Sequence, residues 1–241
     1  MFTIFFKELN SFFTTAIGYV VIGIFLLATA LFLWVFPGEW NVMDSGYASL
    51  DALFTLAPWL YLFLCPGVTM GMIADERRSG TLELLLTKPV SRWDVVLGKL
   101  FAAWVVVFIA LLPTLIWWLS VNMLSEPRWA TDGAAFWGSW IGLLLLALSY
   151  LSIGIFGSTL SRNQIVVFII SAIICFALYY GFELVGTLLS GSAGYAVSRL
   201  GIHSHYESIA RGVIDSRDVL YFLLIAGLFA CGSLYRLKKI R

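Results

Sequence analysis

The sequence has little charge. Only 12% of its 241 residues are Asp, Glu, Lys or Arg, whereas 61% are hydrophobic. A mean hydropathy of +0.93 excludes an ordinary soluble domain of this length. The two signs nearly balance, at 15 basic and 14 acidic residues, so the composition gives no indication of nucleic-acid binding. The chain is therefore predicted to be an integral membrane protein.

Cysteine is also scarce, and the familiar catalytic motifs are missing. Cys65, Cys175 and Cys231 each lie alone in an apolar segment, which is typical of buried membrane residues rather than of a disulfide set or a metal site. None of the five lysines completes the phosphate-binding pattern G-x-x-x-x-G-K-[ST], and no HExxH motif or Ser/His/Asp set is present. The sequence thus predicts a protein that is not an enzyme and binds no cofactor itself.

Long stretches without ionisable residues divide the chain into membrane spans. A bilayer core of about 30 Å needs about 20 apolar residues in a helix. Six stretches qualify, which predicts a single all-α transmembrane domain over residues 1–241. The first stretch is too long to be a cleaved signal peptide. The predicted spans cover residues 15–36, 52–74, 92–120, 136–160, 164–187 and 218–236.

The distribution of lysine and arginine predicts the orientation. If the N-terminus lies in the cytoplasm, eleven of these residues fall on inner segments and four on outer segments. Basic residues concentrate on the cytoplasmic side of membrane proteins. With six spans, both termini are therefore expected in the cytoplasm, and the protein is expected in a bacterial inner membrane.

The first fourteen residues have an amphipathic pattern. Phenylalanines such as Phe5 recur at helical spacing, while Lys7 lies on the other side and Glu8 follows it. This pattern predicts a helix lying flat in the headgroup layer over residues 1–14. The alternative is that these residues extend the first spanning helix.

A second amphipathic segment, residues 191–217, is predicted to form a short helical element on the outer side. His203 and His205 form an H-x-H pair there, but no third ligand is evident, which favours a polar surface over a metal site. Glu183 is the one acid within an apolar run, which fits either a functional intramembrane carboxylate or a headgroup-level position. The residues expected to share the apolar face of this element are Ile202, Tyr206, Ile209 and Val213.

Charge is concentrated in one segment, "ADERRSGTLELLLTKPVSRWDVVLGK", at residues 74–99. Gly80 can cap a helix in which Glu83 occupies the third position, near the positive end of the helix. Pro89 disfavours helical geometry at the preceding residue. A short helix is therefore expected over Thr81–Thr87, within a coupling segment spanning residues 79–88, between the second and third spans. Ser91 and Asp94 then match the capping box of the next helix.

The short helix carries leucines that a simple connecting loop does not need. Leu82, Leu85 and Leu86 form one stripe that can face the bundle, whereas Leu84 and Lys88 can face a partner. The alternative is a well-capped loop whose basic residues only follow the rule for cytoplasmic loops. That alternative leaves the leucines unexplained, so the pattern favours a docking site for a second protein.

This segment resembles the coupling-helix loop of ABC-2-type transporter permeases, in which an acidic-basic cluster precedes G-T-L-E-x-L-L-x-x-P. The resemblance covers nearly the whole chain, from "FFKELNSFFTTAIGYVVIGIF" to "SHYESIARGVIDSRDVLYF". It implies that the N-terminal helix and the coupling segment contact an ATPase subunit. The positions implied are Phe5, Lys7 and Glu8 in the interfacial helix, and Glu76, Arg77, Arg78, Gly80, Thr81, Glu83, Leu84, Thr87, Lys88 and Arg162 elsewhere.

The resemblance also implies partners. These are an ABC ATPase dimer, which binds ATP and Mg²⁺, and a second permease that is either identical or a related protein with a large extracytoplasmic domain. The chain is similar in pattern to the gliding-motility permeases, while permeases for nitrous-oxide-reductase maturation and for lipid, polymer or drug export share much of this pattern. An ATP-independent carrier or scaffold is the remaining alternative. Membrane lipids are expected to surround the chain.

Overall fold

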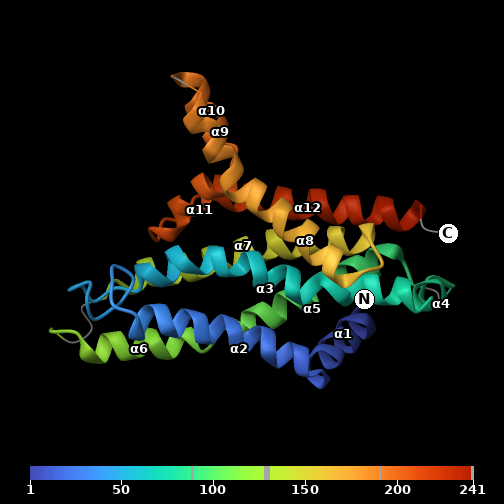
Figure 1. The fold of residues 1–241 in the computed structure, drawn as a ribbon, viewed down its shortest axis with the longest axis horizontal. Helices are drawn as coiled ribbons and strands as arrows, with labels where there is room; N and C mark the ends of the chain where they lie inside the picture. Colours follow the sequence, from blue (N-terminus) through green and yellow to red (C-terminus); the bar gives the residue numbers. More distant parts are fainter. Residues whose placement is uncertain (88–89, 128–130, 190, 240–241) are drawn as a thin grey trace.

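The computed structural model describes residues 1–87, 90–127, 131–189 and 191–239. Within these ranges every regular element is helical (Figure 1), and six helical segments are long and apolar enough to cross a membrane. The predicted all-α membrane fold with six spans is therefore confirmed. The elements are α1 (Phe2–Thr14), α2 (Ala16–Ala30), η1 (Leu31–Val35), α3 (Asp51–Arg78), α4 (Thr81–Thr87), α5 (Arg92–Leu111), α6 (Thr114–Leu124), α7 (Gly133–Leu160), α8 (Gln164–Phe176), η2 (Ala177–Gly181), α9 (Phe182–Leu188), α10 (Ser192–Ser198), α11 (Ile202–Ala210) and α12 (Ser216–Lys239).

The third span differs from the sequence prediction. One continuous helix is expected over residues 92–120, but α5 ends at Leu111 and α6 begins at Thr114. Pro113 separates them, and because proline has no backbone N–H it interrupts the ladder of helical hydrogen bonds. The span therefore consists of two helical pieces, and the second continues as far as Leu124.

The second span extends further than predicted toward the charged segment. Its expected end is residue 74, but α3 continues to Arg78, and Ser79 donates its backbone N–H to the carbonyl of Asp75. The charged residues 75–78 are therefore part of a regular helix. As a result, their side chains point in different directions around the helix.

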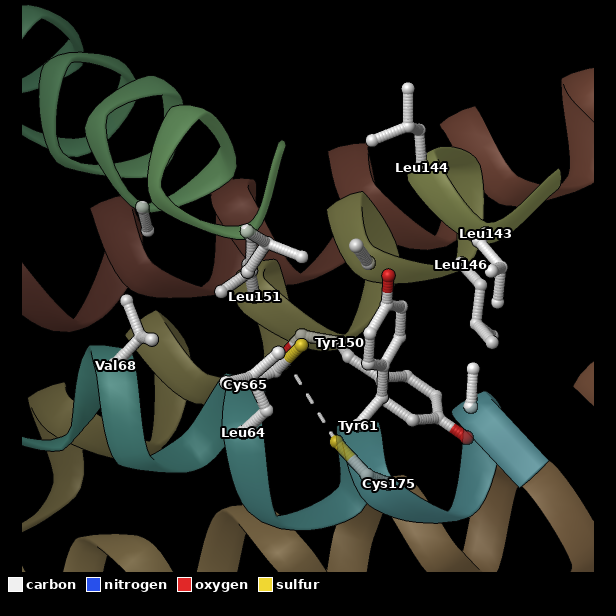
Figure 2. Packing of buried hydrophobic residues seen from close by; sticks show 14 of the residues in the cluster. Tyr61, Leu64, Cys65, Val68, Leu143, Leu144, Leu146, Tyr150, Leu151 and Cys175 are labelled. Atoms are coloured by element: carbon white, nitrogen blue, oxygen red, sulfur yellow. Dashed lines mark hydrogen bonds between the residues drawn. The ribbon is translucent and has the colours of Figure 1, made fainter. Parts of the chain in front are cut away.

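Helices α3 and α7 form the centre of the bundle. In their most apolar windows 67% and 78% of the residues are buried, against 22% in the first and fifth spans. Figure 2 shows Tyr61 of α3 beside Tyr150 of α7, with Cys175 of α8 close by. The close approach of α3 and α7 depends on Gly154, because a Cβ atom there would lie 2.0 Å from Oγ1 of Thr69.

The two ends of the bundle differ. Both termini lie toward the end that carries α4, and α1 packs against α5 there (Figure 1). We call this the α4 end. Helices α9 and α10 project from the bundle away from this end (Figure 1).

The predicted outer helical element is present as α10 and α11. Ile202, Tyr206 and Ile209 are buried where α11 lies on α7, as the predicted apolar face requires. Val213, in contrast, is 62% exposed, so its assignment to this face is corrected. The reason is that α11 ends at Ala210 and the chain turns at Gly212, with φ +85°, which removes Val213 from the helical repeat.

Candidate functional site

The short helix α4 has one buried and one exposed side. It follows Gly80, whose φ of +73° lies in the left-handed region that favours glycine and reverses the chain after α3. Leu82 is buried, whereas Leu84 is 66% exposed and Glu83 is exposed beside it. A large apolar side chain is thus presented at the tip of the bundle. Lys88 and the side chain of Leu86 lie outside the described residues.

The first residues of α5, which follow the α4 segment in the chain, form a regular helix cap. Ser91 Oγ accepts a hydrogen bond from the backbone N–H of Asp94 at 3.1 Å, and Asp94 Oδ2 accepts one from the backbone N–H of Ser91 at 3.2 Å. This is the predicted capping box. The amino group of Met1 lies 3.5 Å from Asp94 Oδ1, so the beginning of α1 lies against the beginning of α5.

Four charged side chains join α1, α3 and α5, and we call them the charge cluster: Lys7, Glu8, Glu76 and Lys99. Lys99 Nζ lies 2.8 Å from Glu8 Oε1 and 3.1 Å from Glu76 Oε1, and it donates a hydrogen bond to the carbonyl of Met72 at 2.7 Å. The side chain of Lys99 is fully buried, and those of the two glutamates are 11% exposed. A buried ammonium is stable only with such partners.

Lys7 is the surface-exposed member of the charge cluster. Its Nζ lies 2.9 Å from Glu76 Oε1 and 3.6 Å from Glu8 Oε1, and its side chain is 59% exposed. Partial burial opposes the charged form of Lys7, but hydrogen bonding and attraction to Glu76, and then Glu8, outweigh it and raise its pKa above 10.5. The cluster thus pairs two lysines with two glutamates.

The cluster changes the interpretation of three predicted contacts. Glu76 is turned inward and pairs with Lys7 and Lys99, and its contact with an ATPase stays a prediction. Lys7 and Glu8 bind to α3 and α5 and thereby position α1, and the side chain of Phe5 is partly buried. Lys99 was missed from the sequence, although a lysine that begins a long apolar run is a signal that it needs a buried partner.

The arginines at the α4 end fall into two groups. Arg78 is exposed beside Gly80, where it remains available to a partner. Arg77 points back along the bundle, and its Nη1 donates a hydrogen bond to the carbonyl of Thr159 in α7 at 2.5 Å. Arg162, in the loop between α7 and α8, and Arg236, near the end of α12, lie close enough to repel the Arg77 guanidinium electrostatically.

Away from the α4 end, two histidine–carboxylate contacts join α11 to α9 and α12. Nδ1 of His205 lies 2.7 Å from Asp218 Oδ1 and forms a hydrogen bond with it. Nδ1 of His203 lies 2.8 Å from Glu183 Oε2, although the two atoms are not aligned as a hydrogen bond. The histidines thus have separate acidic neighbours, and across the described parts of the chain no group of three or more His, Cys, Asp and Glu side chains could hold a metal ion.

The fold and the α4 end define a multi-pass membrane protein with a short, exposed helix between its second and third spans. Residues 63–214, well over half of the chain, match the family described as ABC-2 family transporter protein. The chain belongs to this family, whose members form the transmembrane component of an ABC transporter and work with an ABC ATPase. No curated protein that was compared with the chain matches it significantly.

Proposed function

We propose that α4 is the coupling helix of this permease subunit and that an ABC ATPase binds its exposed side. The observation that carries the proposal is the 66% exposure of Leu84 on a two-turn helix whose neighbour Leu82 is buried. A helix of this length is not stable alone and depends on tertiary packing, which Leu82 provides on one side while Leu84 stays open to a partner on the other. The proposed contact surface consists of Arg78, Gly80, Thr81, Glu83, Leu84 and Thr87, with Lys88 outside the described residues.

The same proposal places the α4 end in the cytoplasm. The basic residues of the chain are concentrated on the segments expected at this end, as on the cytoplasmic side of membrane proteins. Both termini are then cytoplasmic, and the membrane is the bacterial inner membrane. ATP and Mg²⁺ are bound by an ATPase dimer, which two permeases complete, either identical or related.

The mechanism follows from the connection between α4 and the spans. Closure of the ATPase dimer around ATP pushes α4, and α4 packs against the end of α3. Because only the turn at residues 79–80 separates α4 from α3, and α3 is helical up to Arg78, a push on α4 is passed to the centre of the bundle. The charge cluster makes α1 and α5 move with α3. The spans then change between two packing arrangements that face opposite sides.

A pair of leucine variants tests the coupling helix. The full chain is purified in mild detergent from the cells that produce it, and the ABC ATPase that co-purifies with it is quantified. Leu84→Asp is expected to weaken ATPase binding by at least about tenfold, since a central apolar contact contributes about 2 kcal/mol or more at an interface. Leu200→Asp changes a similarly exposed leucine, 59% exposed in the turn before α11, and should leave binding unchanged. Equal binding by both variants would refute the docking role of α4.

The pathway is proposed to be gliding motility, in which the second subunit has a large extracytoplasmic domain. The support is the resemblance of the coupling segment and of the segment around α11 to that group of permeases. Deletion of the gene should abolish movement of cells over surfaces while leaving growth unchanged. A strain that still glides, but fails to mature nitrous oxide reductase or to export a lipid, polymer or drug, would indicate the corresponding alternative.

A further inference from the structure

Three arginines from separate parts of the chain gather at the α4 end, and we call Arg77, Arg162 and Arg236 the arginine cluster. Arg77 lies in the last turn of α3, Arg162 lies between α7 and α8, and Arg236 lies in the last turns of α12. Arg77 donates a hydrogen bond to the carbonyl of Thr159, three residues before Arg162, and α12 packs along α7 with Phe229 against Phe156, which brings Arg236 to the same end. Like charges repel, so this arrangement needs a compensating negative charge.

The described residues do not supply that charge. No carboxylate in the described ranges forms an ion pair with any of the three arginines. Nε of Arg77 and Nε of Arg236 are both buried, and neither has a hydrogen-bond acceptor. A buried donor without an acceptor is costly, and more so when it carries charge. Two such donors beside a third guanidinium indicate a site for an anion.

The surroundings of the arginine cluster are apolar and lie on the membrane spans. Ile165 and Val166, in the first turn of α8 after Arg162, are 69% and 40% exposed, and Tyr235, next to Arg236, is 69% exposed. Both helices belong to spans in which most of the apolar window is not buried within the chain. An anion in this place therefore has hydrocarbon-facing surface beside it, which suits a molecule with a charged head and apolar tails.

We propose that the arginine cluster binds the phosphate of an anionic phospholipid, in the leaflet at the α4 end. Guanidinium groups bind phosphate oxygens through paired hydrogen bonds, and basic pockets between membrane helices bind anionic headgroups in this way. The acyl chains lie along the exposed apolar residues of α8 and α12. The bound lipid joins the ends of α3 and α12 through one shared anion.

Native mass spectrometry of the full chain in mild detergent tests the proposal with three probes. Phosphatidylglycerol and phosphatidylcholine with identical acyl chains separate headgroup charge from tail binding, and inorganic phosphate separates a lipid from a soluble anion. Phosphatidylglycerol should bind at least about tenfold more tightly than phosphatidylcholine. Both lipids carry a phosphodiester anion, but the quaternary ammonium of phosphatidylcholine is repelled by the three guanidinium groups. Inorganic phosphate should not displace phosphatidylglycerol.

Single substitutions test whether phosphatidylglycerol binds at the arginine cluster. Arg236→Gln removes a guanidinium whose Nε has no partner in the chain, and it should weaken phosphatidylglycerol binding by about tenfold. Arg77→Lys retains the positive charge but loses the planar guanidinium with its paired N–H donors, and it should weaken phosphatidylglycerol binding to a similar degree. Lys238→Gln, a change at an exposed basic residue nearby, is the control for general attraction and should have a much smaller effect.

Several outcomes would overturn the proposal. One is equal binding of the two lipids, and another is unchanged phosphatidylglycerol binding in Arg236→Gln. Displacement by inorganic phosphate would identify a site for a soluble anion instead. Loss of a co-purified ATPase from Arg236→Gln with lipid binding intact would assign the cluster to a carboxylate of that partner. None of these outcomes bears on the Leu84 variants, so the lipid site and the coupling helix are tested separately.

Discussion

Replacing Lys99 by methionine should destabilise the protein far more than the same replacement at Lys7. Both lysines contact the same two glutamates, but Lys99 is fully buried and Lys7 is 59% exposed. Methionine matches the length and apolar character of the lysine stem while removing the ammonium. Without Lys99, Glu8 and Glu76 keep only Lys7, at 3.6 Å and 2.9 Å.

The expected magnitude follows from burial. Removing one partner of a buried ion pair typically costs about 3–5 kcal/mol, because the remaining charge stays buried without compensation. The lower end applies here, since Lys7 still compensates part of the charge, so we expect a loss of about 3 kcal/mol. An exposed ion pair is worth about 1 kcal/mol or less, which sets the expectation for Lys7→Met.

Thermal unfolding of the purified variants in the same detergent measures the difference. For a chain of this size about 3 kcal/mol corresponds to a fall in Tm of about 6–12 °C, against about 2–4 °C or less for Lys7→Met. Adding Glu8→Gln to Lys99→Met should recover part of the loss, because Glu76 then pairs with Lys7 alone. Equal Tm values for the two single variants would refute the buried charge cluster.

Two further predictions concern close packing and pH. Gly154→Val should prevent normal packing of α3 on α7, because its Cβ would lie 2.0 Å from Thr69 Oγ1. Gly227→Val should be tolerated, because nothing lies within 4 Å of a Cβ atom at that position. The yield of monodisperse protein in gel filtration distinguishes the two variants. The raised pKa of Lys7 means that its stabilising contribution is fully present below pH 10.5 and is lost as the pH rises above that value. The difference in Tm between the parent and Lys7→Met should therefore narrow above pH 10.5, and a difference that widens would contradict the contact of Lys7 with Glu76.

Much of the fold could be predicted from the sequence because the relevant signals are local. A run of apolar residues long enough to cross a bilayer has few alternatives, since every backbone polar group in hydrocarbon must be satisfied within a helix. The short helix over Thr81–Thr87 and the capping box at Ser91 likewise depend on residues within one or two turns. At Pro113 the local signal was present in the sequence, but the prediction of one span over residues 92–120 did not use it, and the difference was confined to a few residues.

The sequence by itself determined that the chain spans the membrane six times, and it determined where the short exposed helix α4 lies along the chain. Only the tertiary structure decided which charges beside that helix face inward. Glu76 and Arg78 are two residues apart, yet one binds Lys99 across 23 positions of chain and the other faces outward. The physical reason is that the partner of a buried charge is set by how α1, α3, α5 and α7 pack, and packing between distant helices leaves no local pattern in the sequence.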